Sequence, residues 1–149
     1  MALVDHLDSR SILLRPVVAN KWQLLDRLVD AVVDAGQLES GRSEEAKAAL
    51  HAREKSVSTG MENGIAVPHA AMPNLGSVIA TLAILPDGID FQSLDGKPAK
   101  IVVMLLVPKE EKVLHVRTLT EVARRLGEGE FRKALLACDG GAQAVQLWV

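Results

Sequence analysis

Two long aliphatic segments constrain the fold of this chain more than any other feature. Residues 78–85 (VIATLAIL) and 101–107 (IVVMLLV) are nearly continuous runs of β-branched and aliphatic side chains. Runs of this length without polar alternation are typical of strands buried on both faces. They predict two central strands. Residues 86–88 and 95–98, rich in Pro, Asp and Gly, predict turns, and residues 89–91 suggest an additional short strand.

Helical periodicity is found on both sides of these strands. Asn20 is a candidate cap for a helix that ends at Gly36, and a second helix is expected from Ser43 to about Lys55. Three further helical patterns occupy residues 110–126, 130–138 and 142–147. Strands interleaved with helices predict an α/β sandwich around a mixed sheet, with helices on both faces. The length of 149 residues suits a single domain, 1–149.

Composition excludes several classes of protein. No apolar run approaches the roughly 18 to 20 residues that span a bilayer, and the N-terminus lacks the features of a signal peptide, so a soluble, cytoplasmic protein is expected. Cys138 is the only cysteine, which rules out an internal disulfide and a thiolate zinc site and suggests a small buried hydrophobe. A net charge of −2, two Phe, two Trp and no Tyr argue against nucleic-acid binding.

The segment before His69 is the most informative part of the chain for chemistry. Residues 56–64 are rich in Ser, Thr, Gly and Asn and predict a loop, after which residues 65–67 form a short apolar run stopped by Pro68. We expect His69 to lie at a strand end, where sheet gives way to loop and functional groups are common. Taken alone, this local pattern favours a structural histidine bonded to a backbone carbonyl at a tight turn over a functional one.

The other histidines differ in their setting. We interpret His6, in an N-terminal segment without regular pattern, and His51, on the second helix, as solvated surface residues. His115 starts the series Leu119, Val122 and Leu126, whose spacing places it on the sheet-facing side of a helix, near the N-terminal end. A helix N-terminus favours a nearby phosphate, although His115 alone also fits the edge of a core.

Three polar residues precede His69. Arg53 ends the second helix, where an arginine commonly complements the helix dipole, and Ser58 and Thr59 offer hydroxyls in a flexible loop. Together with the histidines they suggest phosphoryl transfer, because neutral imidazole is a nucleophile and arginine stabilises phosphoryl oxygens. The sequence has neither an acidic cluster for magnesium nor a histidine spacing for zinc, so no metal or cofactor is expected.

A family resemblance rests on these residues. Residues 53–69, REKSVSTGMENGIAVPH, closely resemble the signature of the IIA domains of the bacterial phosphoenolpyruvate-dependent phosphotransferase system, in the fructose/mannitol and nitrogen-regulatory branch. The similarity continues through residues 95–98, 101–108 and 115–126, and leaves only about the first twenty residues uncovered. It implies the mannitol-IIA type of α/β sandwich.

The resemblance also implies roles for particular residues. His69 would accept a phosphoryl group from the histidine phosphocarrier protein, His115 and Arg53 would complete the active site, and Ser58 and Thr59 would bind the phosphate. The group would pass to a IIB component or signal to a regulated kinase or transporter. Ala70 and Met61-Glu62 depart mildly from the family pattern, which affects the rim of the site more than its chemistry. The absence of a IIB or membrane segment is most like the nitrogen-regulatory type.

Two rival hypotheses belong to other classes. The chain could be a regulatory binding module of the same fold without onward transfer, a reading compatible with a phosphorylation switch at His69. It could also be a hydrolase using Ser58 or Thr59 with His69 as base, but no acidic residue is spaced to orient the imidazole and no nucleophile-elbow motif is present. The sequence names no sugar, downstream partner or oligomeric state.

Overall fold

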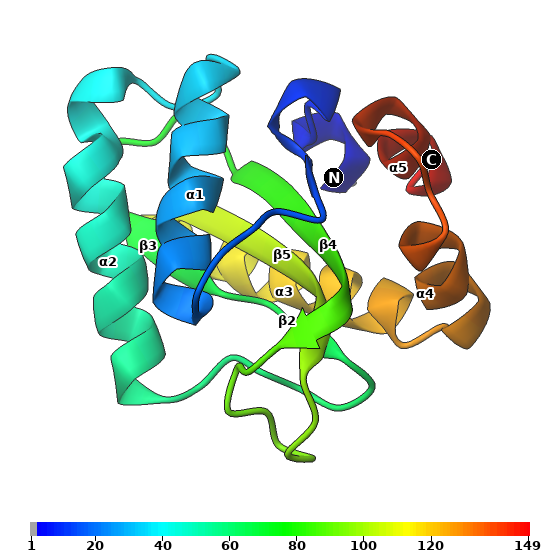
Figure 1. The fold of residues 1–149 in the computed structure, drawn as a ribbon. Helices are drawn as coiled ribbons and strands as arrows, with labels where there is room; N and C mark the ends of the chain where they lie inside the picture. Colours follow the sequence, from blue (N-terminus) through cyan, green and yellow to red (C-terminus); the bar gives the residue numbers. More distant parts are fainter. Residues whose placement is uncertain (1–2) are drawn as a thin grey trace.

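A mixed five-stranded sheet forms the centre of the computed structural model, which describes residues 3–149 (Figure 1). The strands run in the order β1-β4-β5, with β2 and then β3 paired to the far side of β5. Only β4 and β5 pair in antiparallel fashion; the remaining pairs are parallel. The strands are β1 (Leu13–Leu14), β2 (Ile65–Ala66), β3 (His69–Met72), β4 (Ile79–Ile89) and β5 (Ala99–Pro108).

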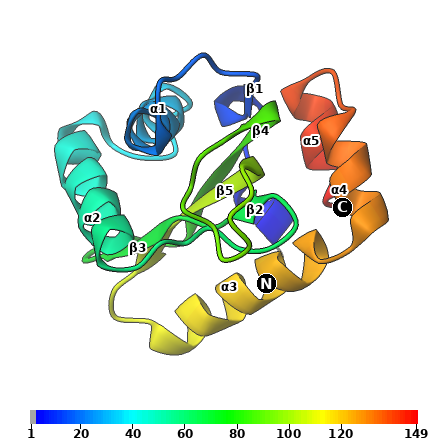
Figure 2. The same cartoon turned by 60° about the horizontal axis from the view of Figure 1, so that its bottom comes forward.

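Helices cover both faces of this sheet. Figure 2 shows α1 (Lys21–Asp34) and α2 (Ser43–Ser56) on one side and α3 (Lys112–Leu126), α4 (Gly129–Leu136) and α5 (Gly141–Leu147) on the other. Three short 3-10 helices, η1 (Leu3–His6), η2 (Ser9–Ser11) and η3 (Ser40–Arg42), complete the described chain. The predicted α/β sandwich with a mixed sheet is confirmed.

The two faces of the sheet belong to two separate hydrophobic clusters. Successive residues of β5 alternate between them: Val103 and Leu105 pack with α3 and α4, whereas Met104 and Leu106 pack with α1 and α2. This alternation follows from the two-residue period of a strand. Because both faces are covered, every residue of β5 from Ile101 to Val107 is buried, which explains why its sequence lacks polar alternation.

The central strands are confirmed, but the expected turn at residues 86–88 is wrong. The chain remains in β4 through these residues, and the pairing with β5 shifts register between Ile84 and Ile89. Gly88 adopts φ +78°, and a Cβ there would come within 2.6 Å of Pro98 Cβ. The proline and glycine therefore mark an irregularity inside a strand, and the additional strand expected at 89–91 is absent. A turn is also present near the expected 95–98, but it is closed two residues earlier, by Gly96 N–H donating to Ser93 O at 3.0 Å.

The predicted ends of α1 are also present. The Asn20 side chain accepts a hydrogen bond from the N–H of Gln23 at 2.9 Å, and the Gln23 side chain in turn accepts from the N–H of Ala19 at 2.8 Å. This reciprocal arrangement satisfies donors that a helix start otherwise leaves unpaired. Gly36 follows the helix at φ +80°. Cys138 is buried just after α4, as expected.

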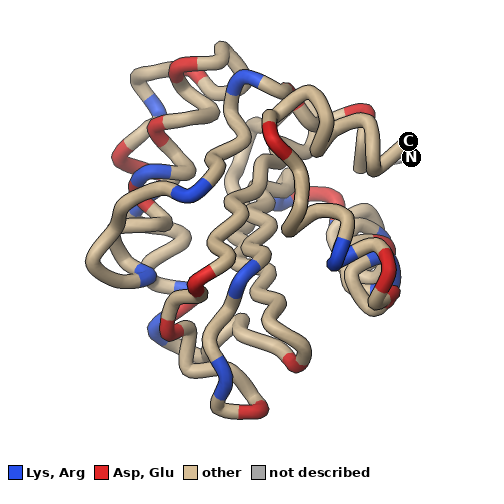
Figure 3. Tube along the Cα trace, turned by 45° about the vertical axis from the view of Figure 1, so that its right-hand side comes forward, with Lys and Arg blue, Asp and Glu red and all other residues tan. Residues whose placement is uncertain are grey.

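Charged residues lie mainly on the helices and loops around the sheet (Figure 3). Within residues 3–149, no helix combines the length and the hydropathy needed to cross a membrane. Because the net charge of the chain is −2, a site that binds an anion needs positive groups close to it.

Candidate functional site

His69 begins strand β3, so it lies at a strand end as expected, but the sheet continues after it. After β2, the carbonyl of Pro68 accepts a hydrogen bond from Leu105 N–H at 3.0 Å, and His69 then pairs with Leu105 as the first residue of β3. The expectation that the sheet gives way to loop at His69 is wrong, because pairing with β5 resumes there. Val67 belongs to the cluster on the α3 side, and the two-residue strand period turns His69 to that side as well.

The His69 ring is held in one orientation by its own backbone. Its Nδ1 lies 2.8 Å from the carbonyl oxygen of Val67. A carbonyl can only accept, so Nδ1 carries the proton and Nε2 keeps a free lone pair. Burial lowers the pKa of His69, and the positive charge of Arg53 and the neighbouring His115 lower it further, whereas the Val67 hydrogen bond and the charge of Glu54 oppose this shift. The ring is therefore neutral at pH 7, with Nε2 available as a nucleophile.

His115 is the second ring of the site. It lies in the first turn of α3, and its ring centroid is 5.3 Å from that of His69 in an edge-on arrangement with an interplanar angle of 74°. The spacing argument thus placed His115 correctly on the face of α3 that turns toward the sheet. Burial lowers the pKa of His115, with a further contribution from the charge of Arg53.

Arg53 supplies the positive charge that both histidines experience. It lies in the last turn of α2, and its Nη1 donates to the carbonyl of Val57 at 2.8 Å. A pocket of about 380 Å³ extends between this arginine and His69. It is lined by Arg53, Val57, Ser58, Thr59, Gly60, Met61, Val67, His69, Leu94, Leu119 and Ala123. None of these residues is acidic, so the pocket favours an anion.

Ser58 and Thr59 line the same pocket, but their hydroxyls are already hydrogen-bonded to other groups of the protein. Ser58 Oγ donates to the carbonyl of Phe91 and accepts from Gly60 N–H at 3.0 Å. Thr59 donates through both its hydroxyl and its backbone N–H to the carboxylate of Glu54. Arg53, Ser58, Thr59 and His69 thus line one pocket, and the ring of His115 lies next to that of His69. The two hydroxyls form hydrogen bonds that hold the conformation of the loop.

Comparison with known proteins settles the family. The sequence profile of the family "Phosphoenolpyruvate-dependent sugar phosphotransferase system, EIIA 2" matches residues 5–147. The chain belongs to this family. It is 34% identical over 128 residues to a "PTS system fructose-specific EIIA component" from Haloferax volcanii, covering 86% of this chain and 81% of the relative. It is 33% identical over 146 residues to a "Nitrogen regulatory protein" from Bradyrhizobium diazoefficiens, covering 97% and 92%.

Solved structures share the fold. The nitrogen regulatory protein IIA-Ntr from Neisseria meningitidis superposes with a TM-score of 0.88 at 22% identity, covering 99% of both chains. A complex of enzyme IIA for mannitol with phosphorylated enzyme IIB, from Escherichia coli, contains a chain that matches with a TM-score of 0.75 at 19% identity and 95% coverage of each.

Two residues of this IIA protein that the sequence interpretation missed form a buried ion pair beside the pocket. Lys21 Nζ lies 3.1 Å from Glu54 Oε2, and the side chains are 5% and 1% exposed. One signal could have identified Glu54: a carboxylate in the last turn of a helix opposes the helix dipole and needs a local reason to be there. Lys21 carries the corresponding signal, because it is the first residue of α1, where a cation also opposes the helix dipole. The pairing of the two residues, 33 positions apart, could not be inferred from either signal.

The remaining histidines of the IIA chain lie elsewhere. His51 is half-buried and not solvated as expected: its Nε2 lies 2.9 Å from Asp26 Oδ1, and its ring centroid is 5.4 Å from that of Trp22. His6 belongs to η1 and its backbone carbonyl accepts from Gln37, so the N-terminal segment has more structure than its sequence indicates. Within residues 3–149, no group of three His, Cys, Asp or Glu side chains is placed to hold a metal ion.

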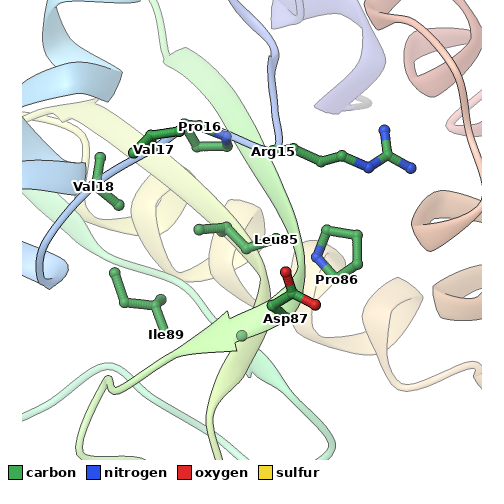
Figure 4. Close-up of a pocket in the computed structure, with 9 residues that line it drawn as sticks. Arg15, Pro16, Val17, Val18, Leu85, Pro86, Asp87 and Ile89 are labelled. Carbon is green, nitrogen blue, oxygen red and sulfur yellow. The ribbon is translucent and has the colours of Figure 1, made fainter.

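A second cavity of about 350 Å³ lies between the segment 15–18 and the end of β4 (Figure 4). Its labelled residues are mainly apolar, and the Arg15 side chain extends away from Val17, Val18 and Ile89. None of the four histidines lines this cavity. The pocket at His69 therefore remains the candidate site.

Proposed function

We propose that this IIA protein carries a phosphoryl group on Nε2 of His69. The observation that supports this most directly is the hydrogen bond from Nδ1–H to the Val67 carbonyl, which leaves Nε2 unprotonated beside a pocket that holds Arg53 and lacks acidic side chains. A structural histidine satisfied by the same carbonyl would need neither the cation nor the pocket.

The proposed transfer balances without a cofactor. The Nε2 lone pair forms a bond to phosphorus while the nitrogen–phosphorus bond of the donor's phosphohistidine breaks, and the electron pair of that bond returns to the donor ring. Nδ1 keeps its proton throughout, so the ring of His69 gains positive character. The Val67 carbonyl that accepts from Nδ1–H stabilises this charge.

The neighbours of His69 stabilise the phosphoryl oxygens in this proposal. The planar fork of Arg53 is suited to two oxygens at once, and the neutral ring of His115 provides an N–H donor on the adjacent side. Ser58 and Thr59 form the phosphate-binding loop, in which rotation of the Ser58 hydroxyl from Phe91 toward the pocket would add a further donor. Positioned donors of this kind stabilise the dispersed charge of a phosphoryl transition state.

The rim of the pocket is suited to a protein partner. Val57 and Leu94, which are 66% and 81% exposed, line the pocket, and Val113 and Val116, 67% and 63% exposed, flank His115 on α3. Exposed aliphatic side chains gathered around a reactive group indicate an interaction surface. We propose that the histidine phosphocarrier protein docks there as donor and that a IIB component, as in the E. coli mannitol complex, or a regulated kinase or transporter docks there afterwards.

Incubation with phosphoenolpyruvate, enzyme I and the histidine phosphocarrier protein tests carriage directly. We expect one phosphoryl group per chain, labile in acid and stable in base, as is characteristic of phosphohistidine. Omission of the phosphocarrier is the control and should abolish labelling. A wild-type chain that takes up no phosphate from the complete mixture would contradict the proposal.

A second candidate function, regulation through phosphorylation state, is favoured by the nitrogen-regulatory relative. A phosphoryl group adds a charge of about −2 beside the apolar rim and could change which protein binds there. Capture of partners with His69→Asp and His69→Ala separates the two cases. A partner bound by only one variant supports a switch, whereas equal capture by both variants, combined with transfer from the wild type to a IIB component, supports a relay.

A further inference from the structure

The ion pair between Lys21 and Glu54 touches the loop of the proposed phosphate site but neither of its histidines. We propose that Glu54, held by Lys21, is a positioning residue for phosphoryl transfer, which fixes the turn Ser58–Gly60 as the wall of the pocket opposite His69. This inference rests on the proposed function of His69 as phosphoacceptor.

Both oxygens of the Glu54 carboxylate accept hydrogen bonds from other residues. Its Oε2 accepts from Lys21 Nζ at 3.1 Å and from the backbone N–H of Thr59 at 2.9 Å, and its Oε1 accepts the Thr59 hydroxyl. Glu54 and Lys21 are 3% and 4% exposed as whole residues. Both donors of Thr59 are therefore committed to one carboxylate, which leaves that residue a single orientation.

The same ammonium holds the segment on the other side of the turn. Lys21 Nζ donates to the Gln92 side chain at 2.8 Å and approaches the Phe91 carbonyl at 3.5 Å. That carbonyl also accepts the Ser58 hydroxyl. Through Glu54 and through Phe91, Lys21 is thus connected to both hydroxyl residues of the phosphate loop.

The turn is packed too closely to be displaced at low cost. A Cβ on Gly60 would lie 2.6 Å from Ser93 Oγ, 2.8 Å from Ser93 Cα and 2.9 Å from the Phe91 carbonyl oxygen. The backbone of the turn therefore rests directly on residues 91–93, and Leu94 N–H adds a hydrogen bond to the Gly60 carbonyl at 3.3 Å. A displacement of Lys21 or Glu54 would therefore also displace Ser58 and Thr59.

The arrangement also explains why a carboxylate can be adjacent in sequence to Arg53. Consecutive helical residues diverge by about 100°, so Arg53 reaches the His69 pocket while Glu54 points to Lys21 and the turn. A buried ion pair is a weak source of net stability, because desolvation offsets much of the attraction. Its specific effect here is to order the loop while the ammonium neutralises a charge that would repel phosphate.

Glu54→Gln tests this role, because it removes the negative charge that holds Lys21 and leaves one acceptor oxygen for the three hydrogen bonds that the carboxylate accepts. We would measure the rate of phosphoryl transfer from the phosphorylated histidine phosphocarrier protein over a range of donor concentrations. The limiting rate constant should fall about tenfold to a hundredfold, the effect of a small misplacement of reacting groups, while the half-saturating donor concentration changes less than about twofold.

Two controls distinguish positioning from loss of stability. Leu28→Ala removes a fully buried side chain of α1 and destabilises the fold, and Lys47→Met breaks the exposed pair with Asp30 that also joins α1 to α2. Both should keep the limiting rate constant of the folded protein within about twofold of the wild type. If Leu28→Ala slows transfer as much as Glu54→Gln at matched stability, the role is merely structural and the inference fails.

A double variant keeps the test decisive if Glu54→Gln does not fold. Lys21→Met with Glu54→Gln leaves no unpaired buried charge, so it should fold, yet it should remain slow because the turn has lost its carboxylate. Transfer at the wild-type rate by either folded variant overturns the positioning role of Glu54 but leaves the proposed function of His69 intact. Failure of the wild type to label overturns the proposed function instead, so the two failures can be told apart.

Discussion

Two histidines of this chain, His69 and His51, are both half-buried and both hydrogen-bonded, yet their surroundings oppose one another. His69 donates to a backbone carbonyl and faces a pocket that contains Arg53 and no acidic residue. His51 contacts the carboxylate of Asp26 at 2.9 Å, in a pocket that is also lined by Glu44 and by Lys47, whose ammonium is paired with Asp30 and Glu44. A phosphoryl group is attracted to the first pocket and repelled from the second.

Under the proposed function, the environment of each ring, and not the imidazole itself, selects the phosphoacceptor. Around His69, burial and the charge of Arg53 keep the ring neutral, and the Val67 carbonyl decides which nitrogen is free. His51 instead connects α2 to α1 through Asp26 and lies against Trp22. Four predictions test this contrast.

The largest effect is expected for His69→Gln, with His51→Gln as the matched control. Glutamine keeps a polar side chain but has no nucleophilic nitrogen, so His69→Gln should show no acid-labile label. His51→Gln should label at the wild-type rate and lose at most about 1 kcal/mol of unfolding free energy, because the pair with Asp26 is partly exposed. Full labelling of His69→Gln, or loss of label in folded His51→Gln, would remove the distinction between the two histidines.

Arg53→Met should have the next largest effect. Removal of a cation that stabilises transition-state charge typically lowers the rate roughly 10²-fold. The transfer rate of Arg53→Lys should lie between those of Arg53→Met and the wild type, because lysine keeps the charge but lacks the planar guanidinium group. Rapid-quench measurement of the limiting transfer rate checks the order. The control is Lys55→Met, on the exposed side of the same helix end. Equal rates for Arg53→Met and Lys55→Met would show that the arginine only completes the helix.

A smaller effect is expected for Leu94→Asp at the apolar rim. The charge should weaken docking of the donor by about 1 kcal/mol, which raises the half-saturating donor concentration roughly fivefold and leaves the limiting rate nearly unchanged. Val149→Asp is the control, because Val149 is similarly exposed, at 77%, but does not line the pocket. A response of equal size in both variants would argue against a docking role for the rim.

The smallest effect concerns pH. Since the pKa of His69 lies below its usual value of about 6.5, the ring stays mainly neutral at pH 6.5, and the transfer rate should decline only at lower pH. Arg53→Met removes a positive charge that lowers this pKa, so it should move the decline toward higher pH. Titration of the His69 ring by nuclear magnetic resonance gives the same comparison without the donor. A midpoint above 6.5 in the wild type would contradict this account of the site.

Much of the fold follows from local sequence patterns. The aliphatic runs predicted β4 and β5, the Asn20 cap predicted the start of α1, and the spacing of His115 with Leu119 and Val122 placed that ring on the correct face of α3. Each of these features depends on residues within a few positions of each other. The path of β4 through residues 86–88 was missed because Ile84 and Ile89, on either side of these residues, both pair with β5, and local turn chemistry does not reveal that.

The candidate site was predicted only in part, for a similar reason. The residue types of Arg53, Ser58, Thr59, His69 and His115 indicated phosphoryl chemistry, and the structure gathers them. The partners that orient them could not be found, because they are backbone carbonyls, such as those of Val67 and Phe91, or a lysine distant in sequence. Any residue type could supply such a carbonyl, so its position leaves no pattern in the sequence.

The central claim is that Nε2 of His69 accepts the phosphoryl group while Nδ1–H remains bonded to Val67. Nitrogen-15 resonance of the histidine rings, before and after phosphorylation of the uniformly labelled protein, tests it most directly. The account predicts phosphorus on Nε2 of His69 with the Nδ1 proton retained and the His51 and His6 rings unmodified. Phosphorus on Nδ1 of His69, or on any other histidine, would contradict it.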